Sequence, residues 1–253
     1  MPEAPRVLAV VPVYNHAATL PGVVQGLLAQ DLDVLVVDDG STDDPLASLG
    51  GLPLRSLRLD PNQGKGAALL AAARWAQAEG YDLLLTLDAD GQHLPADAPR
   101  LLAEARAHWP ALVVGNRAME DEHVPWSSRF GRAFSNGWVR LECGRRLGDT
   151  QSGFRAYPVA FLVRTPFLTR RYTFEVEVLV KAAWAGLPIR DVPVRVIYPP
   201  AGERISHFRA FRDNARLTAL HTWLVTCRLW ALATGRSYLG RRATTSAKEK
   251  DSA

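Results

Sequence analysis

The sequence predicts an α/β protein: a mostly parallel β-sheet with helices on both faces, followed by a C-terminal amphipathic helical extension. Short apolar runs alternate with longer segments of helical spacing, and strands separated by helices form parallel sheets. Polar motifs follow several of these runs directly, where such sheets bind ligands. With 253 residues, 47% of them hydrophobic, the chain can also fill a sizeable core.

The expected elements follow one another in a regular order. Residues 7–13 form a continuous apolar run, which is typical of a strand buried on both faces. Further strands are expected at 34–37, 54–59, 83–87 and 112–114, with helices at 20–29, 67–78 and 101–108. The second half is expected to contain helices at 126–147 and 174–185, an alternating strand at 189–198 and a long amphipathic helix at 207–234. Between the first two helices, a polar loop at 148–157 is expected to lead into a short strand.

This pattern divides the chain into three expected parts. Residues 1–200 form the α/β domain, residues 201–236 the helical extension, and residues 237–253 a disordered polar tail. Cys143 and Cys227 match no metal-ligand spacing, so we expect reduced thiols. The N-terminus shows no signal-peptide pattern, which predicts a cytoplasmic location.

Basic residues are concentrated late in the chain. The formal net charge is +4, and residues 199–242 contain eight arginines against Glu203 and Asp213. This surplus predicts an anionic surface or substrate for that segment, with a solvated helical face as the alternative. We expect no nucleic-acid partner.

The strongest motif is Asp88-Ala89-Asp90-Gly91-Gln92-His93, directly after the strand expected at 83–87. Side chains two residues apart at a strand end point to the same side, with Cα atoms about 7 Å apart. Asp88 and Asp90 can share a hard cation, or divide a cation and a ribose between them. Mg²⁺ and Mn²⁺ take oxygen ligands and often bind substrate phosphates as well.

Two further motifs are expected near the same edge of the sheet. Asp38 and Asp39 precede Gly40-Ser41-Thr42 and can accept hydrogen bonds from ribose or a base, although Ser41 or Thr42 can also cap a helix. The segment 62–67 lacks the first glycine and the Ser/Thr of a P-loop. Its small residues let the loop approach a nucleotide, with Lys65 near the polar edge; helix initiation is the alternative.

Taken together, these motifs resemble family 2 glycosyltransferases of the polyprenyl-phosphate mannosyl- or glucosyltransferase type. The matching segments are VVPVYNH, VVDDGSTDD, NQGKGAAL, LDADGQH, DTQSGFRAY and FEVEVLVKAAWAGLPIRDVPV, which span roughly residues 6–200 in the family's order. The resemblance implies a GT-A fold and inverting transfer of a hexose from a nucleotide diphosphate sugar such as UDP-glucose or GDP-mannose.

The resemblance also assigns residues to roles. It implies a nucleoside site at Pro12, Tyr14 and Asp39, and we count Asn15, Lys65 and Asp88 as further nucleotide-binding candidates. It further implies a Mg²⁺ or Mn²⁺ site at Asp88, Asp90 and Gln92, and a lipid-phosphate acceptor. In place of the Ser-Lys pair common late in such enzymes, this chain has Ser206-His207, where a protonated His207 can meet a phosphate.

Two acceptor classes stay open at this point. A hydroxyl acceptor must lose a proton, and Asp149 is then the candidate base. A lipid monophosphate needs only cations to position it, and Arg117, Arg129 and Arg132 are candidates, with surface arginines on a helix as the alternative. Ser152 and Arg155 are further candidate contacts for the acceptor phosphate.

The amphipathic segment 208–234 interleaves arginines with tryptophans and leucines, a composition suited to a membrane interface. Its apolar stretch is too short and polar for a predicted membrane span, and packing against the catalytic domain is the alternative. A nucleotidyltransferase is disfavoured because no Gly-rich loop with Arg and Lys follows the first strand. A non-catalytic nucleotide-sugar binder is disfavoured by the intact DxDxQ. The sequence leaves the oligomeric state open.

Overall fold

The computed structural model describes residues 4–117, 126–197 and 210–235, and at 126–131 and 210–215 it describes the backbone alone. The strands are β1 (Val7–Val13), β2 (Asp33–Asp38), β3 (Arg55–Arg58), β4 (Leu83–Thr86), β5 (Leu112–Arg117), β6 (Arg155–Pro158) and β7 (Ile189–Val194). The α-helices are α1 (Leu20–Leu28), α2 (Lys65–Ala78), α3 (Ala98–Ala107), α4 (Trp126–Cys143), α5 (Val159–Arg164), α6 (Phe174–Trp184) and α7 (Ala210–Thr234).

The seven strands form one mixed sheet in the order β3-β2-β1-β4-β6-β5-β7. All neighbouring pairs are parallel except those of β6, which runs antiparallel to both β4 and β5. The predicted mostly parallel sheet is therefore confirmed. The reversed strand brings the loop that precedes it to the edge where the parallel strands end.

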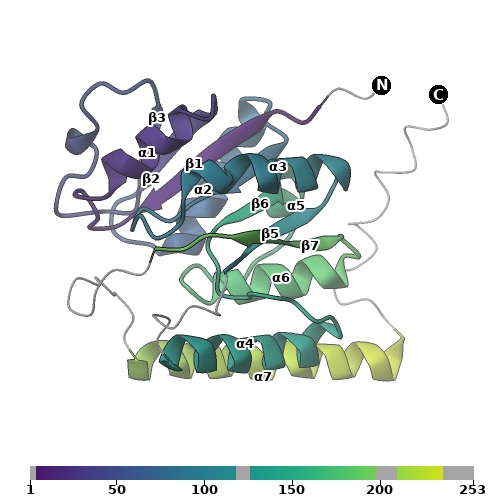
Figure 1. The fold of residues 1–253 in the computed structure, drawn as a ribbon. Helices are drawn as coiled ribbons and strands as arrows, with labels where there is room; N and C mark the ends of the chain where they lie inside the picture. The colour runs from purple at the N-terminus through teal and green to yellow at the C-terminus, as the bar shows by residue number, and fades with distance from the viewer. Residues whose placement is uncertain (1–3, 118–125, 198–209, 236–253) are drawn as a thin grey trace.

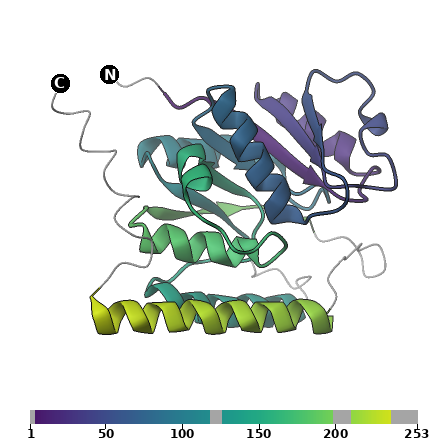
Figure 2. The same ribbon diagram turned by 180° about the vertical axis from the view of Figure 1, so that it is seen from behind.

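Helices cover both faces of this sheet (Figures 1 and 2). Side chains alternate along each strand, so that Ala9 and Val11 pack with α1 and α3 while Leu8 and Val10 pack with α2, α5 and α6. The strands β1, β2 and β4 are buried on both faces, as their continuous apolar runs predict.

A third layer, formed by α4 and α7, lies beyond α6 (Figure 1). Residues 174–182 of α6 are buried all round, because the helix lies between the sheet and this outer layer. Val176 and Val180 of α6 pack with Val139 of α4 and with Leu220 and Leu224 of α7. The inner face of α7 therefore packs on the α/β domain, which was one of the two predicted alternatives.

Several element boundaries differ from the sequence prediction. Helix α4 ends at Cys143 instead of residue 147, because Gly144 adopts a left-handed φ of 74° and its N–H caps the helix on the Arg140 carbonyl. The six-residue helix α5 was not predicted, since fewer than two turns leave no clear periodicity. No helix within the described ranges has an apolar stretch long enough to cross a membrane.

Candidate active site

The loops that follow β1, β2 and β4 lie together at one edge of the sheet, as their positions after parallel strands predict. The N–H of Asn15 donates to Ser41 Oγ at 3.0 Å, and the hydroxyl of Thr19 donates to the Ala89 carbonyl at 2.6 Å. Asn15 has a φ of 56°, which turns the chain sharply after β1. Pro12 is buried in β1, and Tyr14, which follows β1, is half-buried.

Asp39 holds the 62–64 loop in place. Its carboxylate accepts hydrogen bonds from the N–H groups of Gln63 and Gly64, both at 2.7 Å, and from Asn62 Nδ2 at 2.9 Å. Burial raises the pKa of Asp39, although the Gln63 and Gly64 N–H groups oppose this shift. The structure thus gives Asp39 a loop-ordering role, and its contact with a nucleoside stays a prediction.

Lys65 begins α2 and joins two carboxylates from distant parts of the chain. Its ammonium group contacts Asp88 Oδ1 and lies 2.6 Å from Glu175 Oε1, at the start of α6. Burial would lower the pKa of Lys65, but the charges of Asp88 and Glu175 outweigh it and the net shift is upward. Burial would raise the pKa of Asp88, but Lys65 reverses that shift and keeps the carboxylate ionised.

Asp90 and Gln92 lie in the turn after β4. The N–H of Gln92 donates to Asp90 Oδ1 at 2.9 Å. Burial, with the neighbouring charge of Asp88, raises the pKa of Asp90 to about 6. Such a carboxylate is stabilised in its ionised form by a bound cation.

The donor set of this turn fits a hard cation. Two carboxylates and an amide oxygen suit Mg²⁺ or Mn²⁺, which keep several ligand positions for phosphates and water. No cluster of three or more His, Cys, Asp or Glu side chains that could hold a metal occurs in the part of the chain that the structure describes. Mg²⁺ or Mn²⁺ bound by this turn would complete its ligand shell with substrate phosphates and water.

Residues that follow β7 bind the turn that carries Asp90 and Gln92 and the segment after it. The N–H of Ile197 donates to the Gln92 carbonyl at 2.8 Å, and Arg195 forms an ion pair with the buried Asp97 at 2.8 Å. His93 is buried against Phe154, with ring centroids 5.5 Å apart, and burial lowers the pKa of the imidazole to about 4. His93 is therefore neutral at physiological pH.

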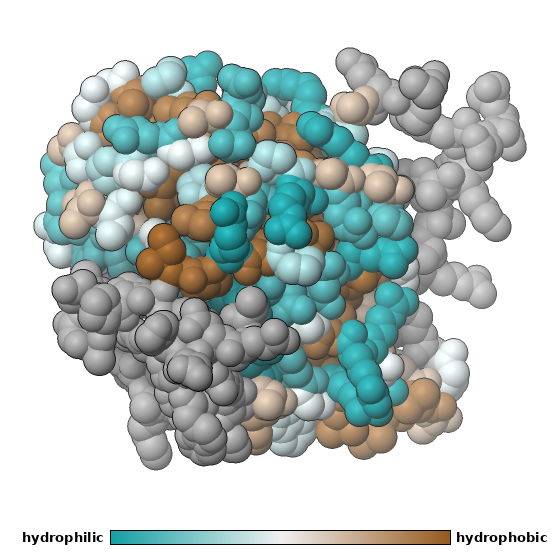
Figure 3. All heavy atoms as spheres, viewed as in Figure 1, coloured by the Kyte–Doolittle hydropathy of each residue, from teal (hydrophilic) through white to brown (hydrophobic). Residues whose placement is uncertain are grey.

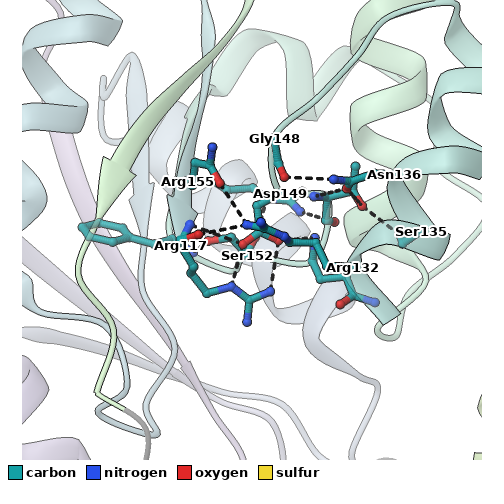
Figure 4. A network of polar contacts seen from close by, with 12 residues as sticks. Arg117, Arg132, Ser135, Asn136, Gly148, Asp149, Ser152 and Arg155 are labelled. Carbon is teal, nitrogen blue, oxygen red and sulfur yellow. Dashed lines mark hydrogen bonds and ion pairs between the residues drawn. The ribbon is translucent and has the colours of Figure 1, made fainter. Parts of the chain in front are cut away.

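Arg117 and Asp149 form a bidentate ion pair beside this loop (Figure 4). Arg117 Nε and Nη2 donate to the two oxygens of Asp149 at 2.6 and 3.0 Å, and the Asp149 side chain is fully buried. Burial would raise the pKa of Asp149, but the hydrogen bond and charge of Arg117 lower it below its ordinary value. Both oxygens of Asp149 are therefore committed to holding Arg117.

Helix α4 packs against the Arg117–Asp149 pair and holds the backbone on either side of it. Arg132 Nη1 donates to the Arg117 carbonyl at 2.9 Å, while Asn136 Nδ2 donates to the Gly148 carbonyl at 2.9 Å (Figure 4). Thr150 in turn donates to Ser135 Oγ at 2.8 Å. The predicted cations Arg117 and Arg132 thus lie together.

Ser152 and Arg155, the other predicted contacts of the acceptor phosphate, lie in the interior. Both side chains are fully buried, and the Arg155 guanidinium donates to the carbonyls of Ser152, Glu175 and Thr150 at 2.6, 2.8 and 2.8 Å. These bonds order the backbone of the loop before β6. The structure thus gives Arg155 a loop-ordering role, and the contact of Ser152 and Arg155 with an acceptor phosphate stays a prediction. The side chain of Arg129 and all of His207 lie outside the described residues.

Sequence reasoning missed three groups at this site. Glu175 lies within the segment that carries the family resemblance, but its pairing with Lys65 connects positions 110 residues apart. Gly153 passes so close to Asp88 that a Cβ there would lie 2.2 Å from Asp88 Oδ2. Arg58 binds the buried Asp38 at 2.6 Å, and nothing in its sequence context signalled this role.

Comparison with known proteins identifies the family. The family described as "Glycosyl transferase family 2" matches residues 8–176. An undecaprenyl-phosphate mannosyltransferase from Micrococcus luteus is 32% identical over 212 residues, covering 78% of this chain and 86% of that protein. A polyprenol monophosphomannose synthase from Mycolicibacterium smegmatis is 30% identical over 203 residues, covering 75% of this chain and 76% of that protein.

Solved structures agree at the level of the fold. Mannosyl-3-phosphoglycerate synthase from Rubrobacter xylanophilus superimposes with a TM-score of 0.66 at 20% identity, covering 90% of this chain and 75% of that one. A mannosyltransferase from Pyrobaculum calidifontis, in complex with GDP-Man and Mn²⁺, superimposes with a TM-score of 0.54 at 19% identity, covering 96% of this chain and 78% of that one. The predicted GT-A fold is confirmed, and the chain belongs to the family 2 glycosyltransferases.

Proposed function

We propose that this glycosyltransferase moves a hexose from a nucleoside diphosphate sugar to a polyprenyl phosphate, with inversion at the anomeric carbon. GDP-mannose is the first donor to test, because both relatives described above are named for mannosyl transfer to polyprenyl carriers. UDP-glucose is the second. The proposed location is the cytoplasmic side of a membrane.

The ion pair between Arg117 and Asp149 is the observation that carries the choice of acceptor. A hydroxyl acceptor needs a base, but Asp149 is buried, its pKa is lowered, and both of its oxygens bind Arg117. A phosphate monoester is mostly dianionic at neutral pH and attacks without losing a proton. Arg117 and Arg132 supply the positive charge that such an acceptor requires.

The reaction follows from this arrangement. An acceptor phosphate oxygen forms a bond to the anomeric carbon as the bond from that carbon to the donor diphosphate breaks, and the nucleoside diphosphate leaves with the electron pair. Arg117, held in one orientation by Asp149, positions the acceptor phosphate. Asp90 and Gln92, beside Asp88, would hold a Mg²⁺ or Mn²⁺ ion, which neutralises the leaving diphosphate when it is bound.

The outer layer offers a surface for the membrane that contains such an acceptor. Phe134 and Leu141 of α4 and Leu229, Trp230 and Leu232 of α7 are between 46 and 69% exposed. Hydrophobic residues are visible along the lower edge of the molecule, where α4 and α7 lie (Figure 3). Exposed aromatic and aliphatic side chains of this kind insert into the headgroup region of bilayers.

The test is release of GDP and UDP from a donor panel with Mg²⁺ or Mn²⁺, with and without a polyprenyl phosphate. We expect release from one donor, stimulated by the lipid phosphate and abolished by EDTA and by Asp90→Asn. Release that a polyprenyl phosphate does not stimulate, but a hydroxyl acceptor does, would support the alternative in which Asp149 acts as base. A donor that is not turned over under any condition would contradict the proposal.

A further inference from the structure

Helix α6 carries a buried pair of opposite charges that the proposed mechanism does not use. Glu177 and Lys181 lie one turn apart and 2.6 Å from each other, and their side chains are only 0 and 2% exposed. A charged pair in an apolar interior costs free energy unless further hydrogen bonds satisfy it. Hydrogen bonds of this kind come from residues 166–173, the stretch without regular secondary structure between α5 and α6, which we call the support segment.

Both charges of the pair bind the backbone at the start of the support segment. Glu177 Oε1 accepts from the N–H of Leu168 at 2.8 Å, and Oε2 accepts from the N–H and the hydroxyl of Thr169 at 2.8 and 2.6 Å. Lys181 Nζ donates to the Pro166 carbonyl. Hydrogen bonds to charged groups are stronger than those between neutral groups, so the pair holds this stretch of backbone in one conformation.

The far end of the support segment lies against the 62–64 loop and the start of α2. The Ala67 N–H donates to the Arg170 carbonyl at 2.9 Å. A Cβ on Gly64 would lie 2.6 Å from the Arg170 carbonyl oxygen and 2.5 Å from Arg171 Cγ. Because any side chain at position 64 would collide with the support segment, glycine there permits this close approach.

Arg171 connects the support segment to the predicted nucleoside site. Its Nη1 donates to Asn62 Oδ1 at 3.0 Å, and Asn62 Nδ2 donates to Asp39 Oδ2 at 2.9 Å. The oxygen of the Asn62 amide therefore faces the arginine and its nitrogen faces the carboxylate, so that Arg171 sets the direction in which the amide points. Asp39, the predicted nucleoside contact, is thus connected through Asn62 and Arg171 to the support segment.

We propose that Arg171, Glu177 and Lys181 are positioning residues for the donor nucleotide. The buried pair fixes the support segment, the support segment places Arg171, and Arg171 holds Asn62 on Asp39. The effect of these residues is therefore expected in donor binding and not in acceptor binding, since the cations proposed for the acceptor belong to β5 and α4. This inference rests on the proposed use of a nucleoside diphosphate sugar.

The decisive measurement is the affinity of the full chain for GDP and UDP, obtained by isothermal titration calorimetry, together with the KM of donor and acceptor. Arg171→Met should weaken binding of the preferred nucleotide about threefold or more, because Asn62 loses the group that orients its amide. Glu177→Gln should weaken it about tenfold or more, because an N–H of the support segment loses its acceptor. In both variants donor KM should rise with the nucleotide Kd, while acceptor KM stays within about twofold of the wild type.

A milder pair of variants tests the same contact. Thr169→Val removes the hydroxyl that donates to Glu177 without changing size, and Thr169→Ser restores it. We expect Thr169→Val to weaken nucleotide binding about threefold, and Thr169→Ser to return it to within about twofold of the wild type. Arg171→Met and Thr169→Val decide the question should Glu177→Gln fail to fold by circular dichroism.

Two controls separate positioning from general effects. Glu142→Gln alters another buried pair, which Glu142 of α4 forms with His221 of α7, and it should lower stability but leave nucleotide affinity unchanged. Arg164→Met removes an exposed positive charge at the end of α5 and should also leave the affinity unchanged.

Two results would overturn the inference. Arg171→Met and Glu177→Gln could leave nucleotide affinity unchanged, or the two controls could weaken it as much as these variants do. Either result, with nucleotide binding and lipid-stimulated transfer of the wild type intact, refutes the positioning role alone. A wild-type chain that binds neither GDP nor UDP refutes this inference together with the proposed donor.

Discussion

Gly153 lies so close to Asp88 and Lys65 that there is no room for a side chain at position 153. A methyl group at this position would lie 2.2 Å from Asp88 Oδ2 and 2.5 Å from Lys65 Nζ. We expect Gly153→Ala to displace the pair and to reduce kcat/KM by about a hundredfold, as misplacement of a catalytic group does. Steady-state kinetics with the identified donor and acceptor would measure this effect.

Gly22→Ala is the matched control, because nothing lies within 4 Å of a Cβ there and Gly22 is in α1, where alanine favours the helix. It should retain wild-type kcat/KM. Equal activity of the two variants would show that the close approach of Gly153 has no functional role.

The pair of Asp149 and Arg117 should be visible in the pH dependence of stability. The pKa of Asp149 is lowered in the folded chain, so its contribution is fully present above its unfolded pKa of about 4 and is lost as the pH falls through the folded value. Asp149→Asn leaves the Arg117 charge without its buried partner and should cost about 3 kcal/mol at pH 7.

Urea unfolding of the wild type and Asp149→Asn at several pH values would test this prediction. The difference in unfolding free energy should be constant above about pH 5 and should shrink as the pH falls below about 4. A difference that grows toward acid pH would contradict a carboxylate stabilised in its ionised form.

At the residue scale, the sequence predicts charges at strand ends better than it predicts their partners. Asp88 and Asp90 could be located because they come shortly after a buried apolar strand. The pairing of Lys65 with Glu175 could not be predicted, since α2 and α6 are far apart in sequence and meet only after the sheet has formed. The burial of Arg155 and its bonds to three backbone carbonyls could not be predicted either, because a motif does not show which of its side chains face the interior.

At the scale of elements, the two sides of α7 should respond differently to substitution. Leu224 is fully buried against α4 and α6, whereas Leu232 is 69% exposed. Leu224→Ala should lower the unfolding free energy by about 2–5 kcal/mol, the usual cost of an apolar cavity. Leu232→Ala should change it by less than about 0.5 kcal/mol, as measured by chemical denaturation. A similar effect of both substitutions would contradict the packing of α7 on the domain.

Helix α7 also shows why the sequence supported two interpretations. Its apolar residues face both inward, as Leu220 and Leu224 do, and outward, as Leu229 and Trp230 do. A periodic pattern identifies an apolar face but not what covers it. The internal helix α6 was easier to predict, because apolar residues occupy most of its surface and strong helix formers surround them.

At the scale of the whole molecule, membrane contact should depend on one face only. Trp230 on α7 and Trp109 after α3 are similarly exposed, at 46 and 41%, but lie in different layers. Trp230→Ser should weaken binding to vesicles that contain an anionic phospholipid by about threefold or more, whereas Trp109→Ser should not. Co-sedimentation with vesicles would measure both. Equal effects of the two substitutions would contradict the proposed orientation.

The reversed direction of β6 has a consequence for how such proteins can diversify. The chain leaves the active-site edge at Arg117, the end of β5, and returns to that edge just before Arg155, where β6 begins beside β5. Both ends of the intervening segment are therefore held at one edge of the sheet, between strands whose register is set by their neighbours. Under the function proposed above, differences in acceptor between related enzymes are expected in this segment and not in the loops that follow β1 and β2.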